Sequence, residues 1–522
     1  MLKQPADVSH SGVQTGSETA RRLPRKFLLA HVHRDALLFI GALTILRFVT
    51  AAFLPLSFDE CYFWLWSKNL AISYYDHPPL IALAIKFGTL LFGDTQFGVR
   101  FVSCGLSVAA SWAVWRAAAI LLASELKGAW ACCLFNASLM VASQSMAAIP
   151  DALVLPASAF LLLVVAKLEA SGDRRWWLGV GWALGFAFLA KYTAIFLAAG
   201  VVVWLVFAEQ GRAWLKSPWP LAALIIVLIC FAPNLVWNAN HDWISFKFQF
   251  GRVVVGRPTF QFLIEFVGAQ IALASPFVLF LAVVTLLGET ARWPKTAPAA
   301  ISACLVWPAF LYFAFHAIHS RVQGNWPSFV YPALVILAAS GRSSAVPSKR
   351  SAAVAFSRLL ALPAASLILL VVYAQAATGF LPLGYRDPLA RMTAIGIAPV
   401  AKGISSLAMR DHAYAIMTSN YVLTCWLAFY INPRRPVIDI TEDYRWLAAP
   451  RADKSALSGP LLYVTQHPAT ESSAVKGHFS SIKFETVLTR YRNGIPLDKF
   501  YVYVLSGFHG GPVGRIPTAS AS

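Results

Sequence analysis

Apolar runs of about twenty residues recur along this chain, and they constrain its fold more than any other feature. Of the 522 residues, 58% are hydrophobic and only 13% are charged, a balance that soluble domains do not show. Each run is long enough to cross a bilayer as a helix, in which every backbone polar group finds its partner within the segment. The sequence therefore predicts an all-α polytopic membrane protein.

The apolar runs predict about eleven transmembrane helices within residues 36–378. The first is expected over 36–56, after a cytoplasmic N-terminal tail at 1–35. The others are expected near 98–123, 129–148, 152–168, 176–190, 193–208, 219–237, 262–287, 300–317, 326–341 and 359–378. Leu80–Phe92 is too short to span and is expected to lie along the interface.

The distribution of basic residues fixes the orientation of this topology. Lys and Arg are concentrated in the segments that the eleven spans assign to the cytoplasm, as the positive-inside rule requires. The same bias explains the net charge of +19, so nucleic acid is not expected as a partner. We expect a multi-pass membrane protein whose polar outer loops face away from the cytoplasm.

The final segment, 379–522, has a different pattern, because its apolar runs are only as long as β-strands. These runs are Ala413–Thr418, Val437–Ile440, Leu461–Thr465, Thr486–Arg490 and Phe500–Leu505. A helical pattern at Asn420–Ile431 lies among them, so we expect a small α/β domain. An odd number of spans places this domain on the outer face of the membrane. It shows no catalytic motif, and we expect it to tune acceptor choice or stability.

The first outer loop, 57–97, is the segment most suited to chemistry. The acidic pair Asp59-Glu60 follows the first apolar run directly, and Asp76-His77 precedes two prolines. Aromatic residues, which favour the membrane–water interface, lie between the two acidic groups. Carboxylates at this boundary are costly unless they are used. One of them can act as a general base or bind a metal, although a solvated helix end would have the same sequence.

Further candidates map to the outer face. Asp151 follows Pro150 at the start of a span, and it is either a catalytic group or an ordinary first-turn residue. His241 can complete a divalent-metal site with Asp76 and His77, although neighbouring ligands alone make no site. The basic candidates for holding a phosphate are Lys191, Arg252, Arg100 and Arg321, each of which would otherwise be a charge facing lipid headgroups.

Several short motifs, taken in order, resemble one family. They are Asp59-Glu60, Asp76-His77-Pro78-Pro79-Leu80, Phe92-Gly93-Asp94, Gly98-Val99-Arg100 and Pro150-Asp151. Their order resembles that of the membrane glycosyltransferases with the GT-C fold. More narrowly, it is similar to the bacterial branch of glycosyltransferase family 39, which is related to protein O-mannosyltransferases and to the aminoarabinose transferases of lipid A. The resemblance is clearest over residues 36–200 and fades towards the tail.

The resemblance implies an inverting transferase that takes a sugar from a polyprenyl phosphate and uses no nucleotide cofactor. Its acceptor is then an envelope molecule, such as lipid A or lipopolysaccharide, another glycan or a protein. Asp59 matches the family's catalytic acidic residue, and Asp151 matches a second one. Asp76 falls where lipid A transferases have a metal-binding glutamate. Lys191 and Arg252 match basic residues that contact phosphate.

One residue departs from the pattern of those relatives. His77 stands where they have a lysine before Pro-Pro, which favours a metal or a neutral imidazole over a fixed positive phosphate contact. The alternative class is a transporter or flippase of lipid-linked sugars. Transporters tend to have internal repeats and broken helices near mid-membrane, whereas this chain concentrates its polar residues at one face. The sequence therefore predicts a glycosyltransferase.

Overall fold

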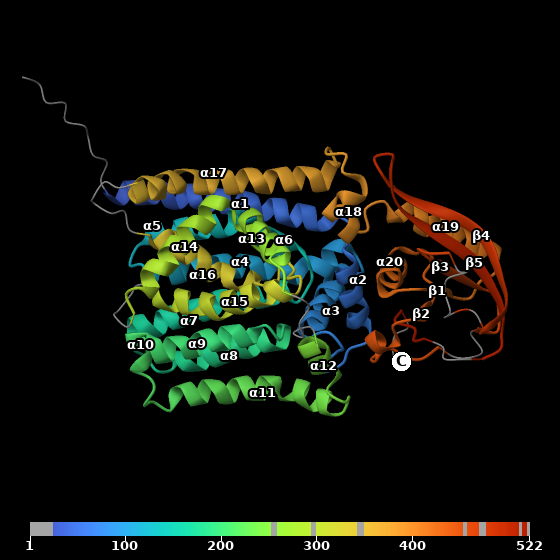
Figure 1. The fold of residues 1–522 in the computed structure, drawn as a ribbon, viewed down its shortest axis with the longest axis horizontal. Helices are drawn as coiled ribbons and strands as arrows, with labels where there is room; N and C mark the ends of the chain where they lie inside the picture. The colour runs from blue at the N-terminus through green and yellow to red at the C-terminus, as the bar shows by residue number, and fades with distance from the viewer. Residues whose placement is uncertain are drawn as a thin grey trace, which may run out of the picture.

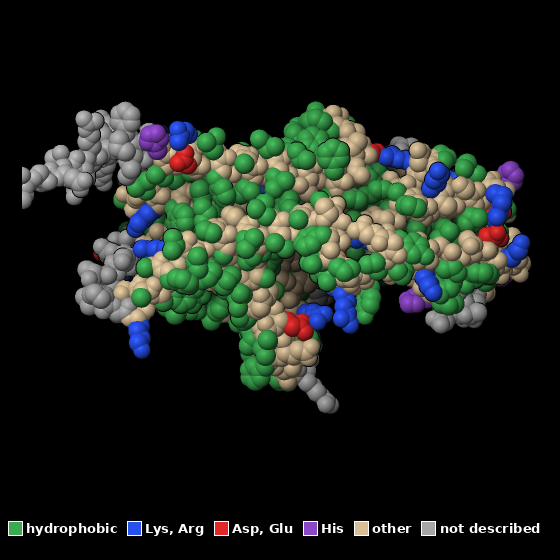
Figure 2. Space-filling view, turned by 90° about the horizontal axis from the view of Figure 1, so that it is seen from above, with side chains coloured by type: hydrophobic (Ala, Val, Ile, Leu, Met, Phe, Trp, Pro, Cys, Tyr) green, Lys and Arg blue, Asp and Glu red, His purple; other side chains and the backbone are tan. Residues whose placement is uncertain are grey.

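The computed structural model describes residues 25–251, 258–293, 299–341, 349–452, 457–468, 475, 477–510 and 514–518. Figure 1 shows a bundle of helices that run side by side and an α/β domain at one end of that bundle. In Figure 2, hydrophobic side chains dominate the surface of the bundle, whereas charged side chains gather at its ends and on the domain. An apolar surface of this extent fits a bundle whose solvent is lipid.

The bundle is built from long apolar helices and a few short connecting ones. They are α1 (Arg25–Phe53), α4 (Gln96–Leu121), α5 (Glu125–Ala137), α6 (Leu139–Met146), α7 (Asp151–Ser171), α8 (Trp176–Ala190), α9 (Ala194–Phe207), α10 (Glu209–Arg212), α11 (Trp219–Ala239), α12 (Ile244–Gly251), α13 (Gln261–Ala274), α14 (Pro276–Thr290), α15 (Ala300–His319), η1 (Ser328–Val330), α16 (Tyr331–Ser340) and α17 (Lys349–Thr378). Two more helices, α2 (Phe58–Lys68) and α3 (Leu80–Phe92), lie between the bundle and the domain.

Each expected span corresponds to a helix or to a bent pair of helices, but the count of eleven is not confirmed. Within the described residues, six helices are long and apolar enough to cross a membrane, or up to eight if each bent pair is one span. The pairs are α5 with α6, bent by 66°, and α13 with α14, bent by 106°. The other three expected spans are shorter helices: α8 has 15 residues, α9 has 14, and the third is Ser328–Ser340. A 15-residue helix is roughly 22 Å long, less than the roughly 30 Å of a bilayer's hydrocarbon core.

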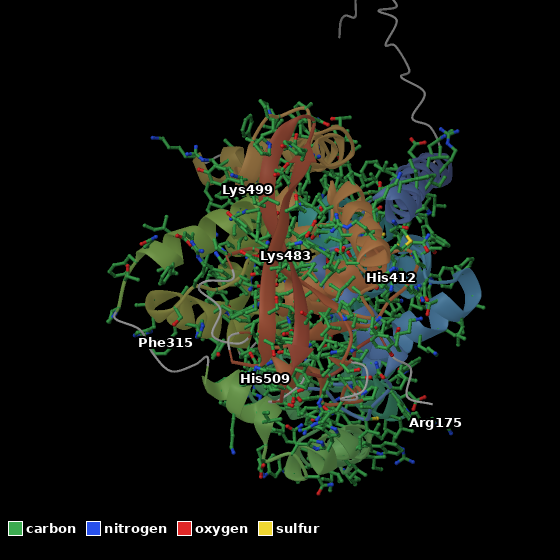
Figure 3. All side chains as sticks on the ribbon, turned by 90° about the vertical axis from the view of Figure 1, so that its right-hand side faces the viewer. Arg175, Phe315, His412, Lys483, Lys499 and His509 are labelled. Carbon is green, nitrogen blue, oxygen red and sulfur yellow. The ribbon has the colours of Figure 1, made fainter. Side chains whose placement is uncertain are left out.

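The tail forms the expected α/β domain around a five-stranded sheet with the order β2-β1-β3-β5-β4. Strand β1 (Ile416–Thr418) pairs in parallel with β2 (Val437–Asp439) and β3 (Leu461–Thr465), while β5 (Ile495–Phe508) is antiparallel to β3 and β4 (Phe479–Arg492). The helices of the tail follow α17 in the chain. They are η2 (Gly384–Arg386), α18 (Pro388–Met392), α19 (Ile397–Arg410), α20 (Tyr421–Tyr430) and η3 (Asp443–Trp446). Viewed from the domain's end, the long β4–β5 hairpin, which includes Lys483 and Lys499, lies across the front (Figure 3).

The domain is docked firmly onto the segment that follows α1. The Ala394 N–H donates to the Leu56 carbonyl at 2.8 Å, and the Leu56 N–H donates to the Tyr430 hydroxyl at 2.8 Å. Farther along, the Asn69 amide donates to the Pro517 carbonyl at 2.9 Å. The α/β domain therefore covers the first loop, and α2 is enclosed between the domain and the bundle. The aromatic side chains of this loop pack in that interface, where the sequence suggested the edge of a membrane.

Candidate active site

Asp59 lies in the first turn of α2, at the boundary between the bundle and the domain. A capping box fixes this turn: the Ser57 hydroxyl accepts from the Glu60 N–H at 3.2 Å, and the Glu60 carboxylate accepts from the Ser57 N–H at 2.8 Å. Asp59 is partly buried, and in the part of the chain that the structure describes no hydrogen bond or ion pair reaches its carboxylate. The group is held in place while its oxygens stay available to a ligand.

The surroundings of Asp59 bring its proton equilibrium close to neutral pH. Burial first, and then the negative charges of Asp76 and Glu60, raise the pKa of Asp59 from 3.8 to about 7. The positive charge of Arg445 opposes this shift, and Asp151 adds a smaller contribution to it. A carboxyl group with such a pKa can accept a proton at physiological pH and release it again. The influence of Asp76 and Asp151 also shows that three acidic candidates share one region.

Glu60, the second acidic residue of the pair, is buried and fully engaged. Its oxygens accept from Arg100 Nε at 2.6 Å and from Arg100 Nη2 at 2.7 Å, and the Ala148 N–H donates to Oε1 at 3.0 Å. Burial raises the pKa of Glu60, but the charge and hydrogen bonds of Arg100, together with the N–H groups of Ser57 and Ala148, outweigh burial, so the pKa lies below its usual value. The remaining Arg100 N–H groups donate to the carbonyls of Ala51, Leu54 and Pro55. The pair joins the start of α2 to α1 and α4. Its placement suits positioning of Asp59, and direct catalytic or phosphate contacts by Glu60 and Arg100 stay predictions.

Asp76 is buried at the edge of the first loop and holds a residue of the tail. Its Oδ2 accepts from the Tyr62 hydroxyl at 2.6 Å and from Arg445 Nη1 at 3.1 Å. Arg445 also pairs with Glu442 at 2.8 Å, and its guanidinium lies 4.3 Å from the centre of the Tyr421 ring. A single arginine therefore connects the first loop with α20 and η3 of the domain.

Asp151 begins α7 and forms the second buried cluster of the region. The Lys191 ammonium donates to its Oδ2 at 2.7 Å, and the Ser328 hydroxyl donates to its Oδ1 at 3.0 Å. Asn325 approaches Oδ2 at 3.4 Å. Asp151 and Lys191 are 3% and 7% exposed, so breaking the pair would leave one buried charge without its partner. The structure thus brings Lys191 together with Asp151, at the end of the bundle that carries Asp59.

Two of the residues predicted to bind a metal, Asp76 and His241, have other partners in this arrangement. Asp76 already accepts from a guanidinium and a hydroxyl. His241 contacts the Trp237 carbonyl through Nδ1 at 2.8 Å, and its ring is stacked on that of Trp237 at 4.0 Å. Across the described residues, no group of three or more His, Cys, Asp or Glu side chains is placed to hold a metal ion. A metal held by Asp76, His77 and His241 stays a prediction, and the mechanism below contains no metal step.

The two remaining candidates for a phosphate contact are Arg321 and Arg252. Arg321 is exposed and pairs with Glu265 at 2.8 Å. Arg252 lies outside the described residues. Of the four predicted phosphate contacts, the structure joins two to acidic candidates: Lys191 to Asp151 and Arg100 to Glu60.

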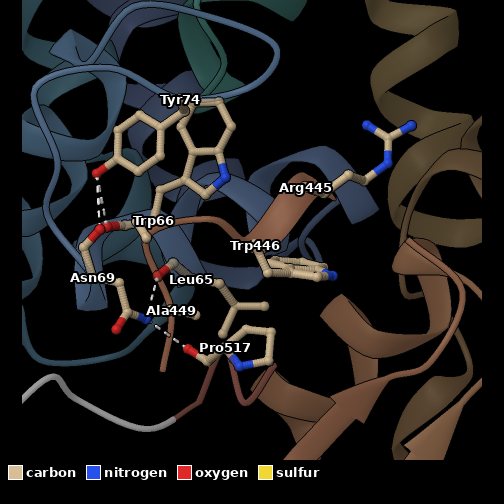
Figure 4. Close-up of a pocket in the computed structure, with 9 residues that line it drawn as sticks. Leu65, Trp66, Asn69, Tyr74, Arg445, Trp446, Ala449 and Pro517 are labelled. Carbon is tan, nitrogen blue, oxygen red and sulfur yellow. Dashed lines mark hydrogen bonds between the residues drawn. The ribbon is translucent and has the colours of Figure 1, made fainter. Parts of the chain in front are cut away.

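Three residues at this site were missed by the sequence analysis: Arg445, Asn325 and Ser328. Arg445 comes from the tail, 369 residues after its partner Asp76, so no local spacing could have paired them. Figure 4 shows Trp446 near the stacked rings of Trp66 and Tyr74, with the Arg445 guanidinium pointing away from them. These four residues are among those that line a cavity of about 10 Å³. Such a volume is enough for about one water molecule. The cluster of aromatic and charged residues from Glu442 to Trp446 was the sequence signal that could have pointed to Arg445.

The arrangement supplies the parts of a group-transfer site. Asp59 offers a carboxylate with a near-neutral pKa, and Lys191 offers a positive charge that Asp151 holds in place. Figure 2 shows a recess near the middle of the molecule, where the apolar bundle meets the mixed surface of the domain. A base for an acceptor hydroxyl and a cation for a departing anion are what such a reaction requires.

Comparison with known proteins places this fold in one class. Over 90% of its length the chain superposes on 97% of ArnT from Cupriavidus metallidurans bound to undecaprenyl phosphate, with a TM-score of 0.61 and 16% identity. The apo state of ArnT gives a TM-score of 0.59, with 91% of this chain and 98% of that one covered. The chain therefore has the GT-C fold of membrane glycosyltransferases, as the sequence predicted.

Comparison of the amino-acid sequence gives two further matches, one to a protein family and one to a single relative. Residues 76–237 match the family described as dolichyl-phosphate-mannose-protein mannosyltransferase. The lipid A galacturonosyltransferase RgtD of Rhizobium johnstonii is 26% identical over 323 residues, which cover 58% of this chain and 65% of that protein. The chain thus spans slightly less than two thirds of this relative.

Proposed function

We propose that this protein is a glycosyltransferase that moves a sugar from a polyprenyl phosphate to an acceptor of the cell envelope. The observation that carries the proposal is Asp59, a partly buried carboxylate with a pKa of about 7 at the end of a GT-C bundle. The likeness to ArnT, a structure of which contains undecaprenyl phosphate, supports the donor class. The likeness to RgtD, a lipid A galacturonosyltransferase, supports lipid A as the acceptor and a uronic acid as the first sugar to test.

The proposed reaction is a single displacement with inversion. The Asp59 carboxylate takes the proton of an acceptor hydroxyl, and the oxygen of that hydroxyl attacks the anomeric carbon. The bond between this carbon and the phosphate oxygen breaks as the new bond forms, and polyprenyl phosphate leaves with the electron pair. Lys191 stabilises the negative charge of the departing phosphate, with Arg252 and Arg321 as further candidates. Glu60 and Arg100 keep α2 in position.

Transfer from a defined donor is the direct test of this function. The purified protein is incubated with polyprenyl phosphates that carry galacturonic acid, aminoarabinose or mannose, together with lipid A. We expect sugar on lipid A from at least one donor, and free polyprenyl phosphate in equal amount. Movement of the intact donor across a vesicle membrane without transfer would instead support the flippase class, which no observation in the described residues favours.

The proposed topology has the N-terminus in the cytoplasm and residues 379–522 in the periplasm of a bacterial inner membrane. The candidate site lies at the end of the bundle that carries the α/β domain, and the bias of basic residues toward the expected inner segments supports an outward orientation of that end. Alkaline phosphatase fused after Ser522 is expected to be active, because it folds only in the periplasm. A green fluorescent protein at the same position is expected to be dark, and the opposite pair of results would reverse the orientation.

Metal dependence is the next prediction. Because Arg445 and Tyr62 already occupy the carboxylate of Asp76, we expect transfer activity to survive exhaustive chelation. The measurement is the transfer rate before and after dialysis against a strong chelator, with elemental analysis of the purified protein. Loss of activity that returns only with an added divalent metal would establish the site at Asp76, His77 and His241 and would require Arg445 to move.

A further inference from the structure

A cavity lies at the end of the bundle opposite the candidate active site, between α14, α16 and α17. Its volume is about 410 Å³, which is in the range of small-ligand sites. Ser328, which bonds to Asp151, begins the helical segment that ends at Ser340, a residue lining this cavity. A helical segment of that length covers roughly 20 Å, so the cavity is separate from the site described above.

The lining of this cavity combines apolar and charged side chains. Leu281, Val284 and Val354 supply the apolar part, and Glu289, Arg292 and Arg350 supply the charges. Such a combination suits a ligand that has a charged head and an apolar body.

Glu289 is the residue that indicates a ligand. Its side chain is only 7% exposed, and its Oε1 pairs with Arg292 Nη1 at 3.0 Å. Its Oε2 is buried and has no hydrogen-bond partner among the described residues. A buried carboxylate oxygen without a donor is costly, and a carboxylate in the last turn of α14 also meets the negative end of the helix dipole. A cationic donor from outside the chain removes both penalties.

Two arginines provide positive charge beside Glu289. Arg292 is about half exposed, at 49% of its side chain, and Arg350 is exposed and forms no hydrogen bond or ion pair with the described residues. The end of α16 does not need them, since Arg358 donates to the Gly341 carbonyl. Both guanidinium groups are therefore available to an anion such as a phosphate.

We propose that this cavity binds the headgroup of an aminophospholipid, represented by phosphatidylethanolamine. The phosphate lies between Arg292 and Arg350, and the ammonium donates to Oε2 of Glu289. The acyl chains follow the exposed apolar side chains of α14 and α17, which include Leu287, Phe356 and Leu359. The order of charges matches the lipid, with its anion beside the exposed arginines and its cation against the buried carboxylate.

The ammonium sets this lipid apart from its relatives. Phosphatidylcholine has the same net charge but no N–H group to donate to Glu289. Phosphatidylglycerol has hydroxyl donors without a positive charge, and charge-assisted hydrogen bonds are roughly twice as strong as neutral ones. We expect phosphatidylethanolamine to bind about tenfold more tightly than phosphatidylcholine, a ratio that corresponds to about 1.4 kcal/mol.

Lipid binding by the delipidated full-length protein tests the proposal without reference to transfer activity. Native mass spectrometry measures retention of phosphatidylethanolamine, phosphatidylcholine and phosphatidylglycerol, each with the same acyl chains. We expect Glu289→Gln to erase the preference for phosphatidylethanolamine over phosphatidylcholine, and Arg350→Gln to weaken binding of all three lipids. Arg175→Gln changes another exposed arginine, which lies between the end of α7 that is remote from Asp151 and the start of α8, and it is expected to change nothing.

Several results would overturn the proposal. Equal binding of the three lipids by the parent protein, or a preference for phosphatidylglycerol, would remove the ammonium from the site. An intact preference in Glu289→Gln would place it elsewhere. Competition by soluble phosphoethanolamine at the concentration of the lipid would show that the ligand is not a membrane lipid. Should Glu289→Gln fail to insert, the exposed Arg350→Gln variant still decides, because unchanged binding there contradicts the phosphate contact.

Discussion

Asp59→Asn is expected to insert and fold normally but to transfer sugar about a hundred- to ten-thousand-fold more slowly than the parent protein. The substitution keeps the size of the side chain and removes its basicity. It breaks no contact in the described part of the chain, because no hydrogen bond or ion pair reaches the Asp59 carboxylate there. The measurement is the transfer rate per amount of inserted protein, with donor binding followed separately.

The matched control for this variant is Asp242→Asn. Asp242 is exposed near the same end of the bundle, and its positive φ of 53° suits asparagine as well as aspartate. We expect the control to keep full activity. Near-normal transfer by Asp59→Asn would move the catalytic role to another carboxylate, with Asp151 as the first candidate.

The pH dependence of both rate and stability follows from the raised pKa of Asp59. The rate is expected to rise with pH around 7, because the base acts in its deprotonated form. Between pH 3.8 and about 7 the folded state keeps a proton that the unfolded state has lost, so this group's contribution to stability falls as pH rises through that window. Asp59→Asn, which resembles the protonated form, is expected to lose this pH dependence and to melt no lower than the parent protein at pH 8.

Glu60 is expected to behave differently from its neighbour. Glu60→Gln removes the charge that neutralises the buried guanidinium of Arg100, and breaking such a pair typically costs about 3–5 kcal/mol. The expected result is poor insertion or a lowered melting temperature, where the sequence alone suggested a second catalytic group. The two adjacent acidic residues differ in their contacts, because Glu60 is bonded to Arg100 and to the Ala148 N–H, whereas no hydrogen bond or ion pair of the described residues reaches the Asp59 carboxylate.

Much of the fold could be predicted because it depends on local pattern. Leu80–Phe92 was expected as a separate short helix and is α3, and the helix at Asn420–Ile431 is α20. Strand β3 has the bounds that the apolar run gave, whereas β4 and β5 each extend to 14 residues as a hairpin beyond their apolar centres. Composition could not decide which helices cross the whole membrane. The lengths of α8 and α9 are set by the turns at their ends, and hydropathy does not reveal those turns.

The only residues of the candidate site that could be predicted were those whose local sequence is unusual. Unusual positions in apolar surroundings identified the pair Asp59-Glu60 and, separately, Asp76 and Asp151. The structure places all four residues in one region. The pairing of Asp76 with Arg445 depends on how the tail docks, which no periodicity encodes. The metal hypothesis rested on Asp76 and His77 being neighbours, and it stays a prediction; the structure adds that Asp76 pairs with a guanidinium from the tail.

Arg445 gives the second large prediction, because it places the tail within the electrostatics of the candidate base. It is only 15% exposed, pairs with Asp76 and Glu442, and lowers the pKa of Asp59 against the effect of burial. Arg445→Gln leaves both carboxylates without their cation, so the pKa of Asp59 is expected to rise further. Transfer at pH 7 is then expected to fall by about tenfold or more and to recover partly at higher pH, since a nearby opposite charge is worth about 1–3 pKa units.

Three comparisons separate this electrostatic role from simple loss of docking. Arg434→Gln is the matched control, because Arg434 also reaches from the tail to the first loop, where it pairs with Asp94 at 2.9 Å and lies over the Trp64 ring. It is expected to lower stability slightly and to leave the midpoint of the pH–rate profile unchanged. Arg445→Lys keeps the charge and is expected to restore most of the profile. If Arg445→Gln lowers the rate equally at every pH, its midpoint staying with that of Arg434→Gln, then Arg445 only fastens the domain to the loop and the proposed tuning of Asp59 is wrong.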